Sequence, residues 1–396
     1  MKILIFKGSS RYDVLSTYSL IATTELRKLG ANAVTVEMNL MNSNDYLRLI
    51  EKFKPDLTLG FNPVTYFYED EKNHIMKTGI PHVLRIGDHP FYHLNNRAML
   101  NPNHPKLLTL STEKFFEQAF ETNKVTRYKR ITTLPGLNVS KQVKFNDKTI
   151  PLCYFGTYHS VDQIILDMQN QFKENPIILK VLMDFCGDLN YLLINNKKYI
   201  QNPIELLLEQ YIRDSLKLDG ESIDKVVKLA FVHVDLFHRN LTRKLALIEI
   251  AESGVEMYTF SAPELQNVLG HYPNVRFFNP VSYLESLHII SQSKANINIT
   301  PMFTSLHERI PNSFLNNSIL FSNKMVDFME SNKELSEGSV FFDQDTISDS
   351  VNHLNSIINN ENIFNDLTEQ NYILAQKKFT FKQELTMLEQ CLKNDF

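Results

Sequence analysis

The stretch Ser293 to Asn323, SKANINITPMFTSLHERIPNSFLNNSILFSN, carries the pattern that decides the fold. Residues 295–300 alternate in the period-two manner of a strand, residues 301–304 break the pattern, and residues 318–321 begin a second strand. Ser305 is placed to cap a helix between the two strands. In open parallel sheets, ligands lie beyond the carboxyl ends of strands, where helix N-termini offer amides to anions. We therefore expect a ligand loop between Pro301 and His307.

Composition describes an ordinary globular protein. The chain has 396 residues, enough for two domains that each bury most of their apolar surface. Hydrophobic residues make up 43% and charged residues 22%, which excludes disordered and fibrous classes. The formal net charge is −4 and the pI is near 6.3, so we expect no nucleic-acid partner.

The ends of the chain and its cysteines favour a cytoplasmic protein. The apolar run of MKILIFKGSS is only four residues long before Lys7, too short for a signal peptide. No stretch approaches the roughly 18 apolar residues of a spanning helix, so we expect no transmembrane segment, although peripheral membrane contact stays open. Cys153, Cys186 and Cys391 are scattered, which argues against disulfides and zinc and for a reducing compartment.

Strands and helices alternate through the first half of the sequence. We expect strands over residues 2–6, 32–38, 56–59, 82–86, 107–111 and 131–134, and helices near residues 15–29, 44–52 and 69–77. Glycines separate these elements: those that follow apolar runs are Gly8, Gly60, Gly87 and Gly156, and those expected to end helices in the left-handed conformation are Gly30, Gly79 and Gly254. Such alternation predicts parallel, Rossmann-like sheets.

The polar segment 141–148 suggests a domain boundary. We expect an N-terminal domain over residues 1–148 and a C-terminal domain over residues 149–378. A helical insertion should occupy about residues 161–228, where apolar residues recur at helical spacing. The last helix, residues 379–396, is expected to pack back across both domains.

Several short motifs follow one another in the second half of the sequence. They are Phe155-Gly156, Asn274-Val275-Arg276-Phe277-Phe278, Ser293-Lys294-Ala295-Asn296-Ile297-Asn298 and Glu308-Arg309-Ile310. In order and spacing they resemble the motifs of bacterial CgeB-like (spore maturation) glycosyltransferases of the family-one type. The resemblance implies the GT-B architecture, with two Rossmann-like domains facing a cleft. It also implies sugar transfer from a nucleotide-sugar to a glycan, protein or other acceptor, with no metal and no further cofactor. The sugar, base, acceptor, anomeric outcome and oligomeric state stay open.

The sequence also departs from this family. Pro311 stands inside the expected helix, and Asn317 replaces the usual glycine. Retaining relatives often carry two glutamates seven residues apart, whereas this sequence has Thr300 and Asn316. These departures motivate an alternative, a catalytically silent GT-B-like protein that binds nucleotide or glycan, or serves as a scaffold. A nicotinamide-dependent epimerase is a third class, but no glycine-rich dinucleotide fingerprint is present.

The expected donor site gathers residues from the second domain. Its members are Gly156, Thr157, Tyr158, Arg239, Lys244, Asn279, Pro280, Val281, Tyr283, Thr304, Ser305, Leu306, His307, Glu308 and Arg309. The amides of residues 305–307 would bind the diphosphate, with Arg239 and Lys244 as cationic supplements. The resemblance implies that Glu308 accepts hydrogen bonds from the ribose hydroxyls, whereas the pattern Ser305-x-x-Glu308 also fits a structural capping box. Residues 279–283 would hold the base, or would end a strand and begin a helix.

The expected acceptor side lies in the first domain. Asp88 or His89 would be the general base, and Gly8, Ser9 and His93 would line the acceptor. The alternative is a polar turn that Asp88 caps.

The same first-domain loop, and the segment His233-Val-Asp235-Leu-Phe-His238, also raise the question of a metal. We expect residues 229–237 to form a strand, which would turn His238 away from His233 and Asp235. Neither group has metal-ligand spacing, so no metal site is expected.

Overall fold

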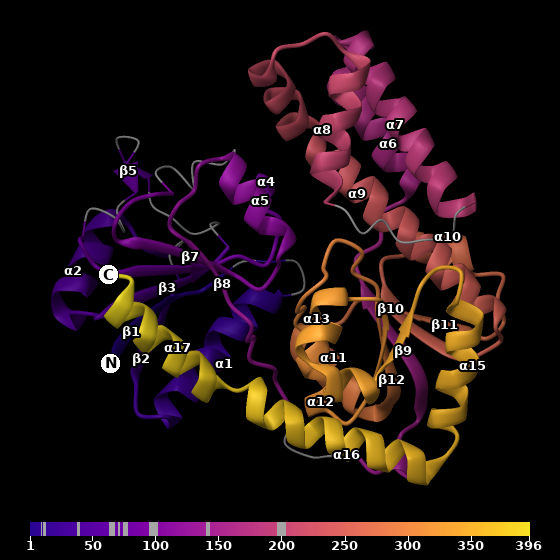
Figure 1. The fold of residues 1–396 in the computed structure, drawn as a ribbon. Coiled ribbons are helices and arrows are strands. Elements are labelled where there is room, and N and C mark those ends of the chain that lie inside the picture. The colour runs from indigo at the N-terminus through magenta and orange to yellow at the C-terminus, as the bar shows by residue number, and fades with distance from the viewer. Residues whose placement is uncertain are drawn as a thin grey trace. The chain divides into compact units, whose positions relative to one another are not determined.

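The computed structural model describes residues 1–396 except 9, 11–12, 38–39, 63–67, 70–71, 74–77, 95–101, 140–142 and 196–202. The chain divides into two compact units (Figure 1). The first unit comprises Met1–Gly136, Ser282–Leu284 and Gln376–Phe396, and the second comprises Leu137–Val281 and Glu285–Ala375. The division therefore falls at Gly136, whereas the sequence suggests residue 148. No described helix combines the length and apolar character needed to cross a bilayer.

The first unit contains a six-stranded sheet whose strands all pair in parallel. Its spatial order is β2-β1-β3-β6-β7-β8. The strands are β1 (Lys2–Phe6), β2 (Asn32–Val36), β3 (Leu57–Phe61), β6 (His82–Arg85), β7 (Leu107–Ser111) and β8 (Tyr128–Arg130). Its helices are α1 (Val14–Lys28), α2 (Ser43–Phe53), α4 (Phe91–Leu94), α5 (Phe115–Thr122) and α17 (Phe381–Asn394).

The second unit contains another parallel six-stranded sheet, in the order β11-β10-β9-β12-β13-β14. Its strands are β9 (Ile150–Gly156), β10 (Met257–Ser261), β11 (Val275–Phe278), β12 (Ser293–Asn298), β13 (Ile319–Asn323) and β14 (Val340–Phe342). Its helices are α6 (Val161–Phe172), α7 (Pro176–Asn195), α8 (Ile204–Ser215), α9 (Gly220–Glu252), α10 (Glu264–Leu269), α11 (Tyr283–Gln292), α12 (Arg309–Leu315), α13 (Val326–Ser331), α14 (Lys333–Glu337), α15 (Ile347–Ile358) and α16 (Glu361–Lys378). The start of α11 and the end of α16 are grouped with the first unit.

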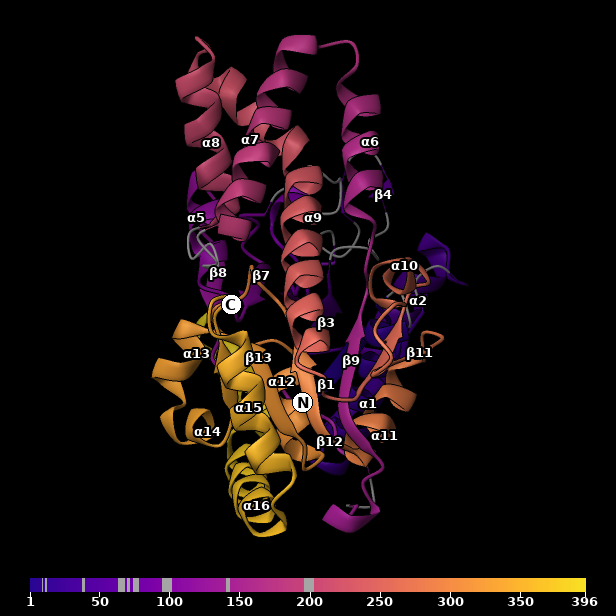
Figure 2. The same cartoon turned by 90° about the vertical axis from the view of Figure 1, so that its right-hand side faces the viewer.

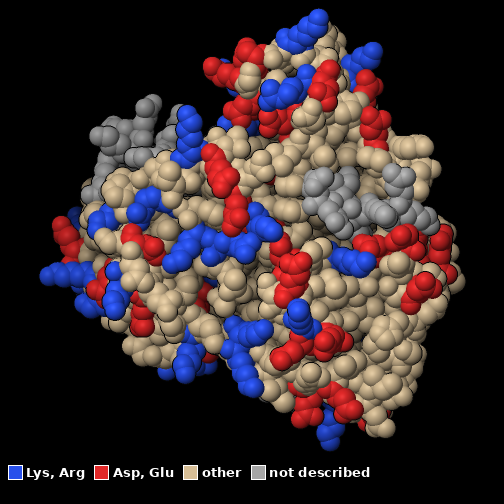
Figure 3. Space-filling view, in the orientation of Figure 1, with Lys and Arg blue, Asp and Glu red and all other residues tan. Residues whose placement is uncertain are grey.

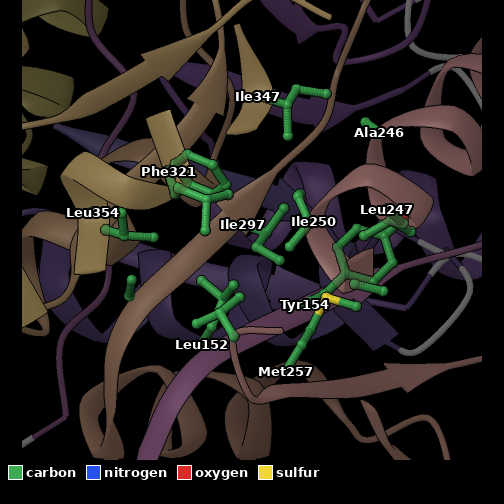
Figure 4. Packing of buried hydrophobic residues seen from close by; sticks show 14 of the residues in the cluster. Leu152, Tyr154, Ala246, Leu247, Ile250, Met257, Ile297, Phe321, Ile347 and Leu354 are labelled. Carbon is green, nitrogen blue, oxygen red and sulfur yellow. The ribbon is translucent and has the colours of Figure 1, made fainter. Parts of the chain in front are cut away.

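Both sheets have the crossover order of Rossmann-like folds, which confirms the predicted α/β class. The central strand β9 is apolar on both faces because it is covered on both, as expected for parallel sheets. One face forms the main core, where Leu152 and Tyr154 of β9 pack with Ile297 of β12 and Leu247 of α9 (Figure 4). This core keeps the ends of β9 and β12 in fixed register, and those ends carry the candidate site.

The helical insertion is longer than the sequence predicts. The expected strand over residues 229–237 is wrong, because α9 runs unbroken from Gly220 to Glu252. Figure 2 shows α9 extending from the bundle of α6, α7 and α8 down to the sheet. Ala230, Phe231 and Val234 are all buried along one helical face, a spacing that a short apolar run conceals. The insertion is thereby joined to the sheet by one rigid helix.

Two other expectations need correction. The strand expected at residues 131–134 is instead β8, displaced toward the N-terminus. In place of a helix at residues 69–77, the described residues form the short hairpin of β4 (Tyr68–Glu69) and β5 (Lys72–Asn73); the other positions of that segment lie outside the described residues. The C-terminal helix α17 belongs to the first unit, where Glu384 forms a buried 2.8 Å ion pair with Arg85.

Candidate functional site

The loop after β12 does not have the helix start that the sequence suggests. Helix α12 begins at Arg309 and has seven residues, so Ser305, Leu306 and His307 precede it in the loop. The predicted capping box is therefore wrong: Glu308 occupies the N-cap position, but its side chain makes no cap hydrogen bond. Leu306 is buried, and the Thr304 hydroxyl donates to Asp327 at 2.5 Å. A diphosphate would need cations here rather than the amides of a long helix.

Glu308 pairs with its neighbour His307. The His307 Nδ1 accepts from the Arg309 backbone N–H at 3.5 Å, so Nε2 carries the hydrogen and donates to the Glu308 carboxylate at 2.9 Å. Burial lowers the pKa of His307, which keeps the ring neutral at pH 7. Burial alone would raise the pKa of Glu308, but His307 and Arg309 together lower it to about 2. Glu308 is thus a fixed, ionised hydrogen-bond acceptor.

The family departures at α12 have structural explanations. Pro311 lies in the first turn, where its missing N–H would have no partner within the helix. Asn317 adopts φ 52°, so it takes the left-handed position as expected. Asn316 is buried, donates to the Leu137 carbonyl at 2.8 Å and accepts from the Val139 N–H at 2.9 Å. Asn316 therefore fixes the chain entering the second unit and is not available to a ligand.

Arg243 is a candidate ligand residue that the sequence analysis missed. Its guanidinium donates to the Thr157 carbonyl at 2.9 Å and to the Ile299 carbonyl at 3.3 Å, and so bridges the segments that follow β9 and β12. In the described part of the chain, no carboxylate forms an ion pair with it. Burial, with the nearby Arg239 and Arg309, lowers the pKa of Arg243 to about 10. This crowded positive charge would be relieved by an anion.

Two further arginines complete a cationic cluster, which we define as Arg239, Arg243 and Arg309. Arg239 stands one helical turn before Arg243 on α9 and pairs with the fully buried Asp235 at 2.5 Å. The Nη1 of Arg309 is buried and has no hydrogen-bond partner among the described residues. Lys244 is the half-buried next residue of α9, about 100° around the helix from Arg243. The cluster gathers three positive charges at this edge of the sheet.

At the end of β9, the backbone of Gly156 packs closely against the side chain of Tyr154, directly before the Thr157 carbonyl that binds Arg243. A Cβ atom at Gly156 would lie 2.3 Å from the Tyr154 hydroxyl, so only glycine fits there. The Gly156 carbonyl accepts from the Ser261 hydroxyl at 2.6 Å, and Tyr158 is buried in the main core. Of the three predicted residues here, Thr157 contacts the cluster, through its carbonyl.

The last residue of β11, Phe278, presents an aromatic side chain that the sequence analysis did not assign to the site. Phe155, Phe260 and Phe278 stand side by side on β9, β10 and β11, with ring centroids 5.1 and 5.0 Å apart and nearly parallel planes. Phe278 is 46% exposed, directly before the exposed Asn279. Pro280 and Val281 follow and are half-buried. An exposed ring in such a stack is suited to a nucleobase.

Tyr283 does not fit its expected role at the base. It is 7% exposed and is grouped with the first unit. The structural interpretation, a core residue at a helix start, therefore applies.

In the first unit, Asp88 follows strand β6 and Gly8 follows strand β1. Asp88 is exposed in the loop after β6, and its Oδ2 accepts from the Asn62 side-chain amide at 2.8 Å. Gly8 is buried after β1, where an added Cβ would lie 2.7 Å from Leu15 Cβ. Ser9 lies outside the described residues. Asp88 is an accessible carboxylate at this edge.

The two histidines beside Asp88 differ from the expectation. His89 is 2% exposed, packs against the rings of Phe91 and Phe116, and accepts the Phe91 N–H at Nδ1, so it is a core residue more than a base. His93 is 7% exposed, and its Nε2 has no hydrogen-bond partner among the described residues. Burial lowers the pKa of His93 to about 4, so this ring is neutral at pH 7.

The histidine and acidic residues considered for a metal do not converge. His233 and Asp235 stand on α9 and not on a strand, and His238 follows one turn later. In the residues that the structure describes, no group of three histidine, cysteine or acidic side chains is arranged to hold a metal ion.

Comparisons with known proteins identify the fold. No family model and no curated protein matches the chain. Solved structures do match over nearly its whole length. An α-glucosyltransferase in complex with UDP-glucose and DNA containing an abasic site has a TM-score of 0.56 at 11% identity, over 98% of both chains. T4 phage BGT in complex with UDP and Mn2+ has a TM-score of 0.51 at 11% identity, over 100% of both. A glycosyltransferase from Rickettsia africae ESF-5 has a TM-score of 0.50 at 11% identity, over 99% of both. The chain thus has the GT-B fold of glycosyltransferases.

The exclusion of nucleic acid from net charge is wrong, because three of the similar structures hold an α-glucosyltransferase together with DNA. The whole-chain charge averages two unlike units. The first unit has 22 Lys and Arg against 16 Asp and Glu, a formal charge of +6. The second has 19 against 29, a formal charge of −10. A basic unit was therefore concealed by an acidic one.

Proposed function

We propose that the protein is a glycosyltransferase that uses a uridine diphosphate sugar as donor. One observation carries the proposal: the three arginines of the cationic cluster gather beside the ionised Glu308 at the carboxyl edge of the second sheet. Ligands of parallel α/β sheets bind at this edge. UDP or UDP-glucose accompanies two of the similar transferases described above, which supports the choice of base.

The cluster would stabilise the leaving diphosphate. Negative charge grows on UDP as the bond between the anomeric carbon and the phosphate oxygen breaks. Arg243 and Arg309 already lie in a partly desolvated place, where fixed cations act more strongly than in water. Because the arginines supply the positive charge, we propose that transfer needs no metal ion.

Glu308 and Phe278 would bind the nucleoside. The ionised Glu308 would accept hydrogen bonds from ribose hydroxyls, and the exposed ring of Phe278 would stack on uracil. The resemblance to CgeB-like transferases supports the role of Glu308, and membership of that family is part of the proposal.

A hydroxyl group on nucleic acid is the acceptor that the charge distribution favours. The first unit is basic, and on the face shown in Figure 3 a row of Lys and Arg crosses it in the region of β8. Lys129 and Arg130 of β8 are both exposed and contact carboxylates only at 3.4 and 3.8 Å. Such exposed pairs are weak and yield readily to phosphates.

Asp88 would be the general base. It would take the proton of the acceptor hydroxyl while the hydroxyl oxygen bonds to the anomeric carbon and UDP departs with the electron pair of the broken bond. A silent binding protein remains the second candidate, favoured by the packing role of Asn316.

Incubation with labelled UDP-glucose and 13-mer duplexes tests the proposal. One duplex contains the 5-hydroxymethyluracil base and a matched duplex contains thymine. We expect label to enter the hydroxymethyl duplex with EDTA present, and Asp88→Asn to abolish incorporation while UDP binding remains. UDP binding without UDP release from any substrate would support the silent protein, and the absence of UDP binding would exclude the proposed transferase.

A further inference from the structure

Asn62 occupies an unusual place at the end of β3. It is the first residue after the strand and adopts φ 53°, the left-handed region that asparagine tolerates better than most other side chains. Its side chain is 8% exposed, and its backbone N–H donates to the Arg85 carbonyl at 2.7 Å. Asn62 is thus fixed between the ends of two neighbouring strands, β3 and β6.

The Asn62 side chain uses both ends of its amide on the loop after β6. Its Oδ1 accepts from the Gly87 backbone N–H at 3.0 Å. Its Nδ2 donates to Oδ2 of Asp88 at 2.8 Å. The two bonds hold the backbone immediately before Asp88 and one of its two carboxylate oxygens, which leaves Oδ1 to receive a proton.

We propose that Asn62 is a positioning residue that fixes the Asp88 carboxylate, so that Oδ1 receives the proton of the acceptor hydroxyl. This inference rests on the proposed role of Asp88 as general base. The buried Nε2 of His93 in α4, which has no partner in the described chain, is a second polar group close to Asp88 that an acceptor could satisfy. Buried polar groups are normally paired, so an orphan at this edge points to a ligand.

The position of Asn62 permits a nearly isosteric test. Asn62→Asp keeps a side chain that tolerates the left-handed backbone and an oxygen for the Gly87 N–H. It replaces only the donor to Asp88 by a second carboxylate oxygen. A like charge at hydrogen-bond distance disfavours ionisation of the pair. Asn62→Gly removes the whole amide yet allows the same φ. It therefore removes the two hydrogen bonds to Gly87 and Asp88, which we call the Asn62 clamp, without adding backbone strain.

The experiment measures the pH dependence of glucose transfer from UDP-glucose to the hydroxymethyl duplex. We expect Asn62→Asp to move the acid limb of kcat upward by about one pH unit or more, since each unit reflects a tenfold change in the protonation equilibrium. We expect Asn62→Gly to lower kcat by about tenfold or more, with the KM for UDP-glucose and the Kd for UDP within twofold of the parent. The control Asn32→Asp adds the same charge at the exposed start of β2, at the opposite edge of the sheet, and should leave the acid limb in place.

A carboxyl 13C titration of Asp88, assigned by its loss in Asp88→Asn, supplies a readout that needs no turnover. Its midpoint should move upward in Asn62→Asp and stay in Asn32→Asp. If transfer occurs and Asp88→Asn abolishes it, but Asn62→Asp changes neither the limb nor the titration, the inference about Asn62 fails and the proposed function stands. If the parent transfers no sugar, the proposed function fails, and an unmoved titration then overturns the clamp as well.

Discussion

Replacing Arg243 by methionine removes one charge from the cationic cluster while keeping much of the side-chain volume. The pKa of Arg243 is lowered from its ordinary value to about 10 by burial and by Arg239 and Arg309. At about 1.36 kcal/mol per pH unit, this corresponds to roughly 3 kcal/mol against the charged guanidinium. The variant also loses the two bonds to backbone carbonyls, each worth about 1 kcal/mol. We therefore expect the unliganded variant to be about as stable as the parent, or slightly more stable.

The same substitution should weaken UDP binding strongly. A charge-assisted hydrogen bond contributes about 1.5–3 kcal/mol, which corresponds to roughly a 10–150-fold change in Kd. Isothermal titration with UDP at low ionic strength measures this change, and thermal unfolding of the same samples measures stability. The matched control is Arg213→Met, which removes an exposed arginine of α8 that pairs with Glu209.

Equal UDP affinity in Arg243→Met and the parent would refute the assignment of the cluster to the diphosphate. A large loss of stability without ligand would refute the argument that the guanidinium is held there at an energetic cost.

Three other substitutions test separate parts of the account. Glu308→Gln should weaken UDP binding at pH 7. Because the pKa of Glu308 is lowered to about 2, the carboxylate contributes fully to the stability of the parent above about pH 4.5, and this contribution is lost as the pH falls toward 2. Acid unfolding of the variant should lack that loss. Phe278→Ala should weaken the binding free energy of UDP by about 1–3 kcal/mol without affecting the binding of inorganic pyrophosphate. Equal effects on both ligands would argue against stacking. Burial raises the pKa of Glu384 although Arg85 opposes this, so the pair stabilises the protein less as pH rises. Glu384→Gln should lower the free energy of unfolding, measured in urea at pH 7, by about 3–5 kcal/mol because it leaves Arg85 buried without its ion-pair partner. A change below about 1 kcal/mol would contradict the buried pair.

The α/β class was predictable because parallel strands leave a local signature. Runs such as Lys2–Phe6 and Leu107–Ser111 are mostly apolar and almost wholly buried, as expected for strands covered on both faces, and the structure has them at the predicted bounds. The left-handed glycines were predictable for a similar reason, since Gly30 and Gly254 have φ 90° and 80° at helix ends.

The error at residues 229–237 shows where local patterns fail. A short apolar run fits a buried strand and a buried helix equally well, and only the longer spacing decides. On a helix, Arg239 and Arg243 lie one turn apart on the same face. Recognising α9 would therefore have revealed Arg243 from the sequence.

Other parts of the site depend on contacts between residues far apart in sequence. The Ser305-x-x-Glu308 pattern predicts a cap, but the Glu308 carboxylate is held by His307 instead. The clamp between Asn62 and Asp88 joins two strand ends that only the sheet order brings together. The net charge of each unit also could not be predicted, because the basic character of the first unit is visible only once the division of the chain is known.

Titration of the whole protein with UDP tests the central claim most directly, namely that the second unit holds a nucleotide-sugar donor. The account predicts saturable binding at one site, displaced by UDP-glucose and weakened at least tenfold by Arg243→Met but not by Arg213→Met. Binding that is absent at millimolar UDP, or equal in both variants, would contradict it.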